Sequence, residues 1–293
     1  MFEGMSVASF NWYFQTDQDC RQYLFNMKWK NGYRCFRCGR VKGYKGKKPF
    51  NIRCAHCGYE ESVTANTLFH KLKIPLLKAF GMVYRIGVKK KGISTLELSR
   101  EFSVNRHSSW LFKRKAQEAM REEEGQKLFA AGIDLAEHSA GALPIGKGKG
   151  RAGVNRKLVI GLARTTGKRL GWGFGVVMAA PKDDPAGDRS RTEPHAIQQQ
   201  EDARAHCDTA TTSNTAGWPH PGSRVKKGLA LVLLNLKTWL RGTHHHCSLR
   251  FVNGYLDEFF FRFNRRNHIE GIWHSLIHGF MKGTPYYYKP YAT

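Results

Sequence analysis

Four cysteines have the types and the spacing that could hold a metal ion. Cys35 and Cys38 enclose two residues, fifteen residues follow, and Cys54 and Cys57 then repeat the arrangement. Each Cys-x-x-Cys turn directs two sulfur atoms at one centre, so the two turns together supply four thiolates to a tetrahedral zinc ion, at about 2.3 Å from each sulfur. Disulfide bonds and four separate thiols are the alternatives. Because four cysteine ligands leave no open coordination position, we expect the Zn²⁺ to be structural and not catalytic.

The residues around these cysteines fit a small metal-stabilised module. Gly39 and Gly58 directly follow the two cysteine pairs, where a tight turn often requires a positive φ angle. Residues 41–53 read as a basic strand and turn, interrupted by glycine and proline. No disulfide framework is indicated by the three other cysteines, Cys20, Cys207 and Cys247. A reducing cytoplasm fits both these scattered thiols and the metal module.

Charge points to a polyanionic partner. The 293 residues include 48 Lys and Arg against 23 Asp and Glu, a net charge of +25. Between Arg34 and Lys91 alone there are fifteen basic residues and two acids, Glu60 and Glu61, which is a net +13. Such density favours double-stranded DNA, with binding that weakens in salt through counterion release. An anionic membrane is the competing partner. We find no signal peptide, no amphipathic basic helix and no apolar run of about eighteen residues that would favour it.

A short helix, a turn and a longer polar helix are predicted downstream of the module. Residues 94–102 and about 106–120 have helical patterns, separated by residues 103–105. Ser94 and Glu97 could form a capping box at the start of the first helix. This layout is typical of helix-turn-helix DNA readers, although two ordinary amphipathic helices could look alike. The expected small core is Leu96, Leu98, Phe102, Val104, Trp110 and Leu111.

The basic side chains expected to contact DNA come from the cysteine module, from a lysine run and from the second predicted helix. They are Arg37, Lys45, Lys47, Lys48, Arg53, Lys89, Lys90, Lys91, Arg106, Lys113 and Arg114.

From residue 127 the pattern changes to short strands and then to helices. Apolar or alternating runs predict strands at 128–135, 158–163 and 170–179. Helices are expected at 229–240, 251–263 and about 268–281. The segment between, residues 182–224, has Ile197 and Trp218 as its only large aliphatic or aromatic residues, so we expect a long, poorly ordered insertion.

Together these stretches resemble bacterial insertion-sequence transposases, which join an N-terminal zinc ribbon to an RNase-H-like DDE catalytic domain. The resemblance covers most of residues 30–130 and 229–290. The matching stretches are Cys35–Cys57, Ser62–Lys71, Lys91–Glu101, Asn235–Thr238, Gly242–His245 and Phe261–Arg266. It implies a protein of the bacterial cytoplasm, associated with the nucleoid, that binds the terminal repeats of its own element as a homo-oligomer. Carboxylates would hold Mg²⁺ for cleavage and strand transfer.

The catalytic positions of this family carry over poorly. The position of the first catalytic acid is occupied by Ala136, and Asp134 and Glu137 are the nearest acids that could replace it. Asp208 is the best candidate for the second acid. The position of the third metal ligand falls in a stretch that contains Ala230 and Leu233. A second motif, at residues 267–273, has the form Asn-x-x-Glu-Gly-x-Trp, but it follows the Phe-Asn-Arg-Arg stretch, so Glu270 is expected to be a surface residue of the last helix. Loss of metal ligands predicts a copy that binds zinc and DNA but transposes poorly or not at all.

The resulting prediction is an α+β multidomain protein. It consists of N-terminal helices at 1–30, a zinc ribbon at 31–62, a helix-turn-helix-like DNA-binding segment at 63–125, and an RNase-H-like α/β domain at 126–293 with a disrupted middle at about 182–226. A DNA transposase is the expected function. A non-catalytic, repressor-like DNA-binding protein is the main alternative, and a ribosomal-type RNA-binding protein is a third.

Overall fold

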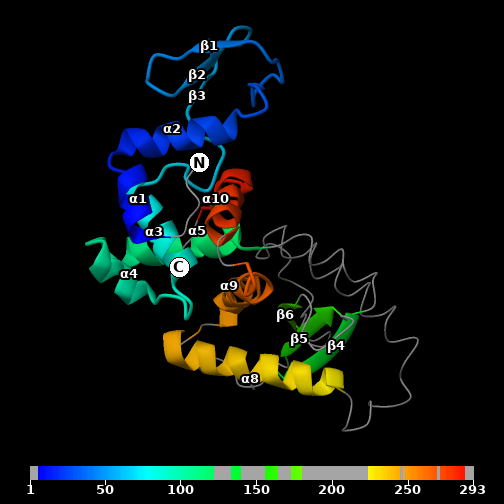
Figure 1. Cartoon of the computed structure of the whole chain (residues 1–293). Helices are drawn as coiled ribbons and strands as arrows, with labels where there is room; N and C mark the ends of the chain where they lie inside the picture. Colours follow the sequence, from blue (N-terminus) through cyan, green and yellow to red (C-terminus); the bar gives the residue numbers. More distant parts are fainter. Residues whose placement is uncertain are drawn as a thin grey trace, which may run out of the picture. The chain divides into compact units, whose positions relative to one another are not determined.

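The chain folds into two compact units. The computed structural model describes residues 6–121, 133–139, 156–163, 173–179, 224–244, 247, 249–268 and 271–287. One unit is formed by residues 1–120 together with 267–293, and the other by residues 121–266 (Figure 1).

The first unit begins with two capped helices, as the sequence predicted. Helix α1 spans Val7–Tyr13 and helix α2 spans Asp17–Lys28. Each starts with a capping box, in which Ser6 and Thr16 accept hydrogen bonds from backbone amides of the first turn and the side chain three residues on bonds back. Two of the helix's unsatisfied N–H groups are thereby paired at each start, which defines where both helices begin.

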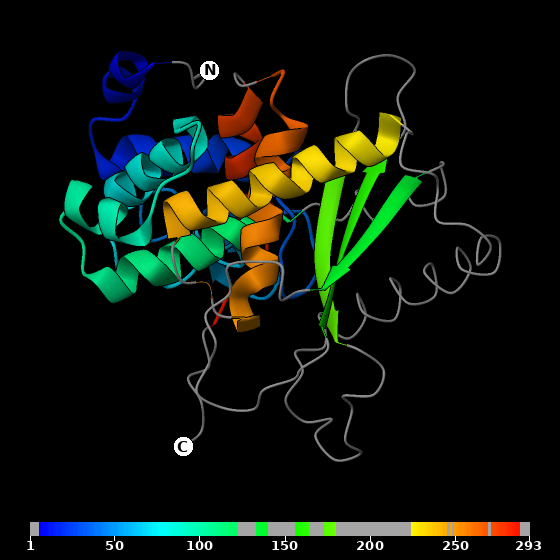
Figure 2. The same cartoon turned by 90° about the horizontal axis from the view of Figure 1, so that it is seen from below.

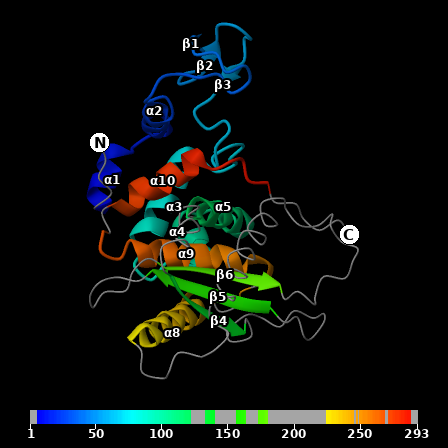
Figure 3. The same ribbon diagram turned by 90° about the vertical axis from the view of Figure 1, so that its right-hand side faces the viewer.

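A three-stranded antiparallel sheet follows α2. Its strands are β1 (Gly43–Lys45), β2 (Ile52–Cys54) and β3 (Glu60–Glu61), in the order β1-β2-β3. Gly43 is needed here, because a Cβ atom at this position would lie 2.6 Å from Ile52 and 2.8 Å from the Tyr33 ring. Figures 1 and 3 show this sheet at one end of the first unit, next to α2 and away from α4 and α5.

Four further helices form the body of the first unit (Figure 2). They are α3 (Leu76–Val88), α4 (Thr95–Glu101), α5 (Arg106–Ala119) and α10 (Ile272–Lys282). Helix α10 packs against both α3 and α5. The aromatic residues buried in this core are Phe10, Phe14, Phe69, Phe80, Tyr84, Phe112, Trp273 and Phe280.

Helix α10 differs from the predicted domain division. Residues 267–293 were expected to close the RNase-H-like domain at 126–293, but they lie in the first unit. Trp273 is buried there, its indole packs near Phe10 and Phe80, and its Nε1 donates to the Tyr23 hydroxyl at 3.4 Å. The apolar face of the last helix is therefore buried against helices that precede it by about 200 residues, a pairing that local sequence pattern does not encode.

The predicted core of the α4–α5 pair is only partly right. Leu98 is buried as expected, whereas Leu96 is exposed and Trp110 and Leu111 are half-buried. Phe112 is the aromatic residue of α5 that the core encloses. Because α5 packs against α4 and also against α10, more than one of its faces is covered, and a single apolar stripe does not describe it.

The second unit contains an antiparallel sheet and two long helices. The strands are β4 (Ile133–Ser139), β5 (Arg156–Ala163) and β6 (Gly173–Ala179), in the order β4-β5-β6. Helix α8 spans Arg224–His244, the short 3-10 helix η4 spans Leu249–Phe251, and helix α9 spans Val252–Asn264. Strands β4 and β6 begin later than the predicted runs at 128–135 and 170–179, and α8 begins before the predicted 229, within the segment expected to be an insertion. Strand β5 and helix α9 lie close to the predicted 158–163 and 251–263.

Helix α9 is anchored to β6 (Figure 3). The Asn264 carboxamide accepts from the Gly173 amide at 2.8 Å and donates to the Gly173 carbonyl at 3.0 Å. Gly175 leaves room for Phe260, because a Cβ atom there would lie 2.5 Å from the phenyl ring. An apolar core then joins Ile160 of β5 to α8 and α9. The predicted insertion at about 182–226 lies almost wholly outside the described residues.

None of the described helices is long and apolar enough to cross a membrane.

Candidate metal centre and DNA-binding surface

The four predicted ligands meet at one point. The sulfur atoms of Cys35, Cys38, Cys54 and Cys57 all lie within 4.8 Å of one another. Cys35 Sγ is 3.6 Å from Cys57 Sγ, and Cys38 Sγ is 3.5 Å from Cys54 Sγ. A tetrahedral zinc ion with bonds of about 2.3 Å requires sulfur atoms about 3.8 Å apart. A disulfide bond requires about 2.05 Å, so the alternative of paired cystines does not fit, whereas a Zn²⁺ ion fits well.

Two glycines shape the turns that carry these sulfurs. Gly39 has a φ angle of 71° and Gly58 has one of 68°, as the sequence predicted. The Gly39 amide donates to the Cys35 carbonyl at 2.9 Å, and the Gly58 amide donates to the Cys54 carbonyl at 3.2 Å. The chain therefore reverses after each pair in the left-handed conformation that glycine adopts without steric cost.

Backbone amides stabilise the thiolate form of the first cysteine in each turn. Burial raises the pKa of Cys35, but the amides of Cys38 and Arg37 and the Tyr33 hydroxyl together lower it to about 6. The Cys57 amide lowers the pKa of Cys54, burial opposes this, and the His56 amide adds to it. Sulfur atoms that accept several N–H bonds are poised to bind a cation as thiolates.

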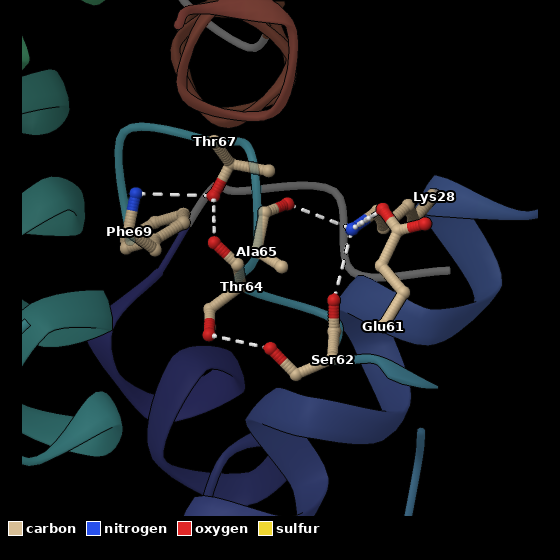
Figure 4. Close-up of polar contacts among 7 residues, drawn as sticks. All are labelled: Lys28, Glu61, Ser62, Thr64, Ala65, Thr67 and Phe69. Carbon is tan, nitrogen blue, oxygen red and sulfur yellow. Dashed lines mark hydrogen bonds and ion pairs between the residues drawn. The ribbon is translucent and has the colours of Figure 1, made fainter. Parts of the chain in front are cut away.

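A buried ion pair fixes the sheet to helix α2 (Figure 4). Lys28 Nζ lies 2.7 Å from Glu61 Oε1, and it also donates to the carbonyls of Ser62 and Ala65 at 2.9 and 2.8 Å. Thr67 closes the same loop, since its hydroxyl donates to the Thr64 carbonyl at 2.8 Å. One ammonium group therefore satisfies three oxygens where the chain leaves the sheet. Local sequence pattern did not indicate this pair, because Lys28 and Glu61 are far apart along the chain.

Exposed basic side chains surround the metal centre. All eight arginine and lysine residues between positions 34 and 53 are exposed. They are Arg34, Arg37, Arg40, Lys42, Lys45, Lys47, Lys48 and Arg53. The nearby acids offset at most one of these charges, because Glu61 is buried and paired with Lys28, which leaves Glu60 alone beside eight cations. We call these eight side chains the ribbon cations.

The other predicted DNA contacts divide into exposed and buried residues. Lys90, Lys91 and Arg106 are exposed, and Asn105 caps the start of α5 by accepting from the His107 amide at 2.8 Å. Lys89 is half-buried and forms an ion pair with Glu97.

Lys113 and Arg114 do not lie where the sequence placed them. Lys113 is 1% exposed and donates to the Ile93 carbonyl, and Arg114 is 5% exposed with its guanidinium 5.6 Å from the centre of the Trp110 ring. Their charge suggested a DNA-reading face, but helix α5 turns both side chains into the first unit. Lys113 ties the start of α4 to α5 through a backbone carbonyl, which is a structural role.

The capping box predicted at α4 is half formed. The Ser94 hydroxyl accepts from the Glu97 amide at 3.1 Å, whereas the Glu97 carboxylate pairs with Lys89. The helix begins where the sequence predicted, but the Glu97 carboxylate forms an ion pair with Lys89 and does not complete the capping box.

Of the predicted catalytic residues, the structure describes only the backbones of Asp134 and Glu137, so their role as metal ligands stays a prediction. Strand β4 carries Asp134 and Glu137, whose backbones pair with Leu162 and Val159 of β5. On α8, Ala230 is exposed and Leu233 is buried in the apolar core. Among the described residues, the four cysteines form the only group of three or more His, Cys, Asp or Glu that could hold an ion.

Two further predicted positions, Asp208 and Glu270, lie outside the described residues. The motif at 267–273 that contains Glu270 leads into α10 of the first unit, where Trp273 is a core residue.

Three large apolar side chains on the ribbon are exposed, and the sequence analysis passed over them. They are Phe36, Val41 and Tyr44. Their alternation with arginine and lysine in the stretch 34–45 was the signal that could have identified them.

Comparison with known families gives two matches. Residues 15–60 match the model of a transposase zinc-ribbon domain, and residues 196–264 match the model of an ISXO2-like transposase domain. The second match begins inside the segment expected to be an insertion, and it includes Asp208, α8 and α9. No curated protein and no solved structure matches the chain.

Proposed function

Because the chain belongs to the insertion-sequence transposases that carry an N-terminal zinc ribbon, we propose that its first unit binds the terminal repeats of its element as duplex DNA. The observation that carries this proposal is the exposure of all eight ribbon cations beside the four-cysteine site. A zinc-stabilised sheet holds these charges at fixed spacing, so they meet phosphates without first losing backbone freedom.

Helices α4 and α5 supply a second contact in this proposal. They form the helix, turn and helix of a DNA reader, with Arg106 and His107 exposed at the N-terminal end of α5. Readers of this kind place the N-terminal residues of the second helix against base edges in the major groove. Lys90 and Lys91, in the loop before α4, add exposed positive charge that suits backbone phosphates.

The second unit is proposed to be an RNase-H-like domain with impaired catalysis. Support for the fold comes from the sheet β4-β5-β6 packed with α8 and α9, and from the matched transposase-domain model. The residues at the expected ligand positions do not fit Mg²⁺, because Ala136, Ala230 and Leu233 have no oxygen ligand in their side chains. Without enough carboxylates to offset its charge, a divalent ion would not stay bound, and we derive no catalytic step through it.

Two assays on the element's own terminal repeats test this proposal. In gel-shift experiments the protein should bind repeat ends with an affinity that falls steeply between about 50 and 200 mM salt. In a Mg²⁺-dependent nicking assay the same ends should stay uncut or be cut very slowly. Vigorous cleavage would overturn the impairment, and binding that ignores salt would overturn the role of the ribbon cations.

A non-catalytic, repressor-like role is the second candidate, and the apolar residues Ala230 and Leu233 favour it. A copy that occupies terminal repeats without cutting them would block other copies of the element. Footprinting on intact ends together with an active relative distinguishes this role, since a repressor protects the repeats and lowers the relative's cleavage. A working transposase must also bridge two ends, so it should assemble as an oligomer on DNA.

A further inference from the structure

Two exposed aromatic side chains on the zinc ribbon have no role in the proposed duplex contact. Phe36 is 71% exposed and Tyr44 is 60% exposed, and neither belongs to the hydrophobic core of the first unit. Single exposed apolar side chains are ordinary, but several that occur together often mark a contact with a partner, and Val41 is exposed between these two rings in the sequence. Phosphate contacts and hydrogen bonds to base edges need polar groups, which a phenyl ring lacks, so duplex binding through the ribbon cations leaves Phe36 unexplained.

Each ring lies next to an arginine. Phe36 occupies the first cysteine turn directly before Arg37, where the amides of Arg37 and Cys38 point at the Cys35 sulfur. Tyr44 lies opposite Arg53 in the antiparallel register of β1 and β2, which places the two side chains on one face of the sheet. Both arginines are exposed.

An aromatic ring beside a guanidinium matches one nucleotide of a single strand. The ring offers a flat apolar face on which an unpaired base stacks, and the arginine reaches the adjacent phosphate. Stacking is tolerant of sequence because every base has a π face, and it requires a base that is not already stacked in a duplex. The eight ribbon cations make this surface strongly positive, which favours a nucleic acid over an apolar protein as its partner.

We propose that Phe36 and Tyr44 of the zinc ribbon stack on unpaired bases of DNA, while Arg37 and Arg53 bind the neighbouring phosphates. This inference rests on the proposed function, since the unpaired bases would belong to frayed or forked ends of the element. The ribbon would then distinguish an opened DNA end from continuous duplex.

Binding to three DNA probes of matched sequence tests the inference. These are a blunt duplex, the same duplex with unpaired tails, and the free single strand, measured by fluorescence anisotropy with full-length, zinc-loaded protein. The tailed probe should bind more tightly than the blunt one. Phe36→Ala and Tyr44→Ala should each weaken binding to the tailed probe by about 5- to 150-fold, the range for loss of one base stack, and should change binding to the blunt duplex little.

Matched variants separate stacking from loss of structure. Trp12→Ala removes an exposed ring on α1, outside the ribbon, and should leave all three affinities unchanged. Tyr44→Phe keeps the ring and should bind as the unmodified protein does. Each variant must retain one zinc ion per chain. A 2-aminopurine base in the unpaired tail should be quenched by the unmodified protein and less so by the double variant Phe36→Ala, Tyr44→Ala.

The outcomes are distinguishable. If the double variant binds the tailed probe as tightly as the unmodified protein, the stacking role is refuted. If the substitutions change only self-association in sedimentation, the rings form a contact between copies and the inference fails. If the unmodified protein binds none of the probes, DNA binding itself fails and the proposed function falls with it.

Discussion

At the scale of single residues, hydrogen bonds to the Cys35 sulfur favour its thiolate form, which is the form that binds a metal ion. Burial raises the pKa of Cys35, but the amides of Cys38 and Arg37 together with the Tyr33 hydroxyl lower it to about 6, against an ordinary value near 9. A thiol with a depressed folded pKa stabilises the folded ribbon above its unfolded pKa, and this contribution is lost as the pH falls through 6. Zinc binding has the same direction, because the ligands must lose their protons to coordinate the ion.

Acidification should therefore release zinc. Because protons compete with Zn²⁺ for the four thiolates, we expect one zinc ion per chain to be retained at neutral pH and to be lost progressively on acidification. A colorimetric zinc indicator read from pH 8 to pH 4.5 measures this release. Cys54→Ser should bind zinc weakly even at pH 8, whereas Cys20→Ser, which changes a buried thiol outside the cluster, should behave as the unmodified protein does. Equal zinc content in both variants would contradict the assignment of the ligands.

The Lys28–Glu61 pair gives a second prediction at this scale. Lys28→Met leaves a buried carboxylate and two loop carbonyls without their shared ammonium group. Removing one partner of a buried ion pair costs about 3–5 kcal/mol, so urea denaturation should show a loss of this size. Lys30→Met changes an exposed neighbour and should cost little. The double variant Lys28→Met, Glu61→Met should recover part of the stability, and a double variant worse than both singles would argue against the pair.

At the scale of elements, helix α5 shows that charge alone does not reveal which way a side chain faces. Arg106 is exposed at its start, whereas Lys113 is buried and holds the Ile93 carbonyl. Both are basic residues on one predicted helix, and the sequence treated them alike. The structure assigns them opposite roles, because α5 is covered by α4 on one side and by α10 on another.

Salt titration separates these two roles. Arg106→Ala should weaken DNA binding and reduce the slope of log affinity against log salt by about 1, the change expected when one contact between a cation and a phosphate is lost. Lys113→Met should lower the free energy of unfolding, since the Ile93 carbonyl loses a buried donor. For the protein that remains folded, the slope of log DNA affinity against log salt should be unchanged. A reduced slope for Lys113→Met would restore the original sequence-based assignment.

The crossing of α5 and α10 depends on a glycine. A Cβ atom at Gly279 would lie 2.1 Å from the Ala119 carbonyl oxygen, a backbone atom that cannot move aside. Alanine normally favours a helix by about 1 kcal/mol over glycine. Here the clash should outweigh that gain, and Gly279→Ala should destabilise the first unit by about 1–3 kcal/mol in thermal or urea unfolding. Gly271→Ala at the start of the same helix meets no atom within 4 Å and should be nearly neutral.

Local features were predictable from the sequence, and distant pairings were not. The cysteine spacing gave the metal site, and the glycines after each pair gave the turns, because both depend on residues a few positions apart. The helix, turn and helix at 95–119 was likewise visible in local pattern. The burial of Lys113 and the position of α10 depend on contacts between segments far apart in the chain.

At the scale of the whole molecule, the first unit is built from both ends of the chain. Residues 1–120 supply the ribbon and the five helices α1 to α5, and residues 267–293 supply α10. The matched transposase-domain stretch ends at 264, just before the chain returns to the first unit. The first unit, which we propose to bind DNA, can therefore complete its core only after the second unit has been synthesised.

This arrangement predicts that damage at the C-terminus abolishes DNA binding. Trp273 is buried among Phe10, Phe80 and Tyr23, all from the first 120 residues. Trp273→Ala should cost about 3–5 kcal/mol, the usual range for a large aromatic in a core, and should lower the midpoint of thermal unfolding along with DNA affinity.

Truncation after residue 266 should have a stronger effect, leaving a first unit with an open apolar face that aggregates or binds hydrophobic dyes. Trp12→Ala, at a ring that is 73% exposed, serves as the matched control and should change neither property. If the truncated chain still unfolded cooperatively and shifted terminal-repeat DNA, α10 would be dispensable, and the first unit would fold from residues 1–120 alone.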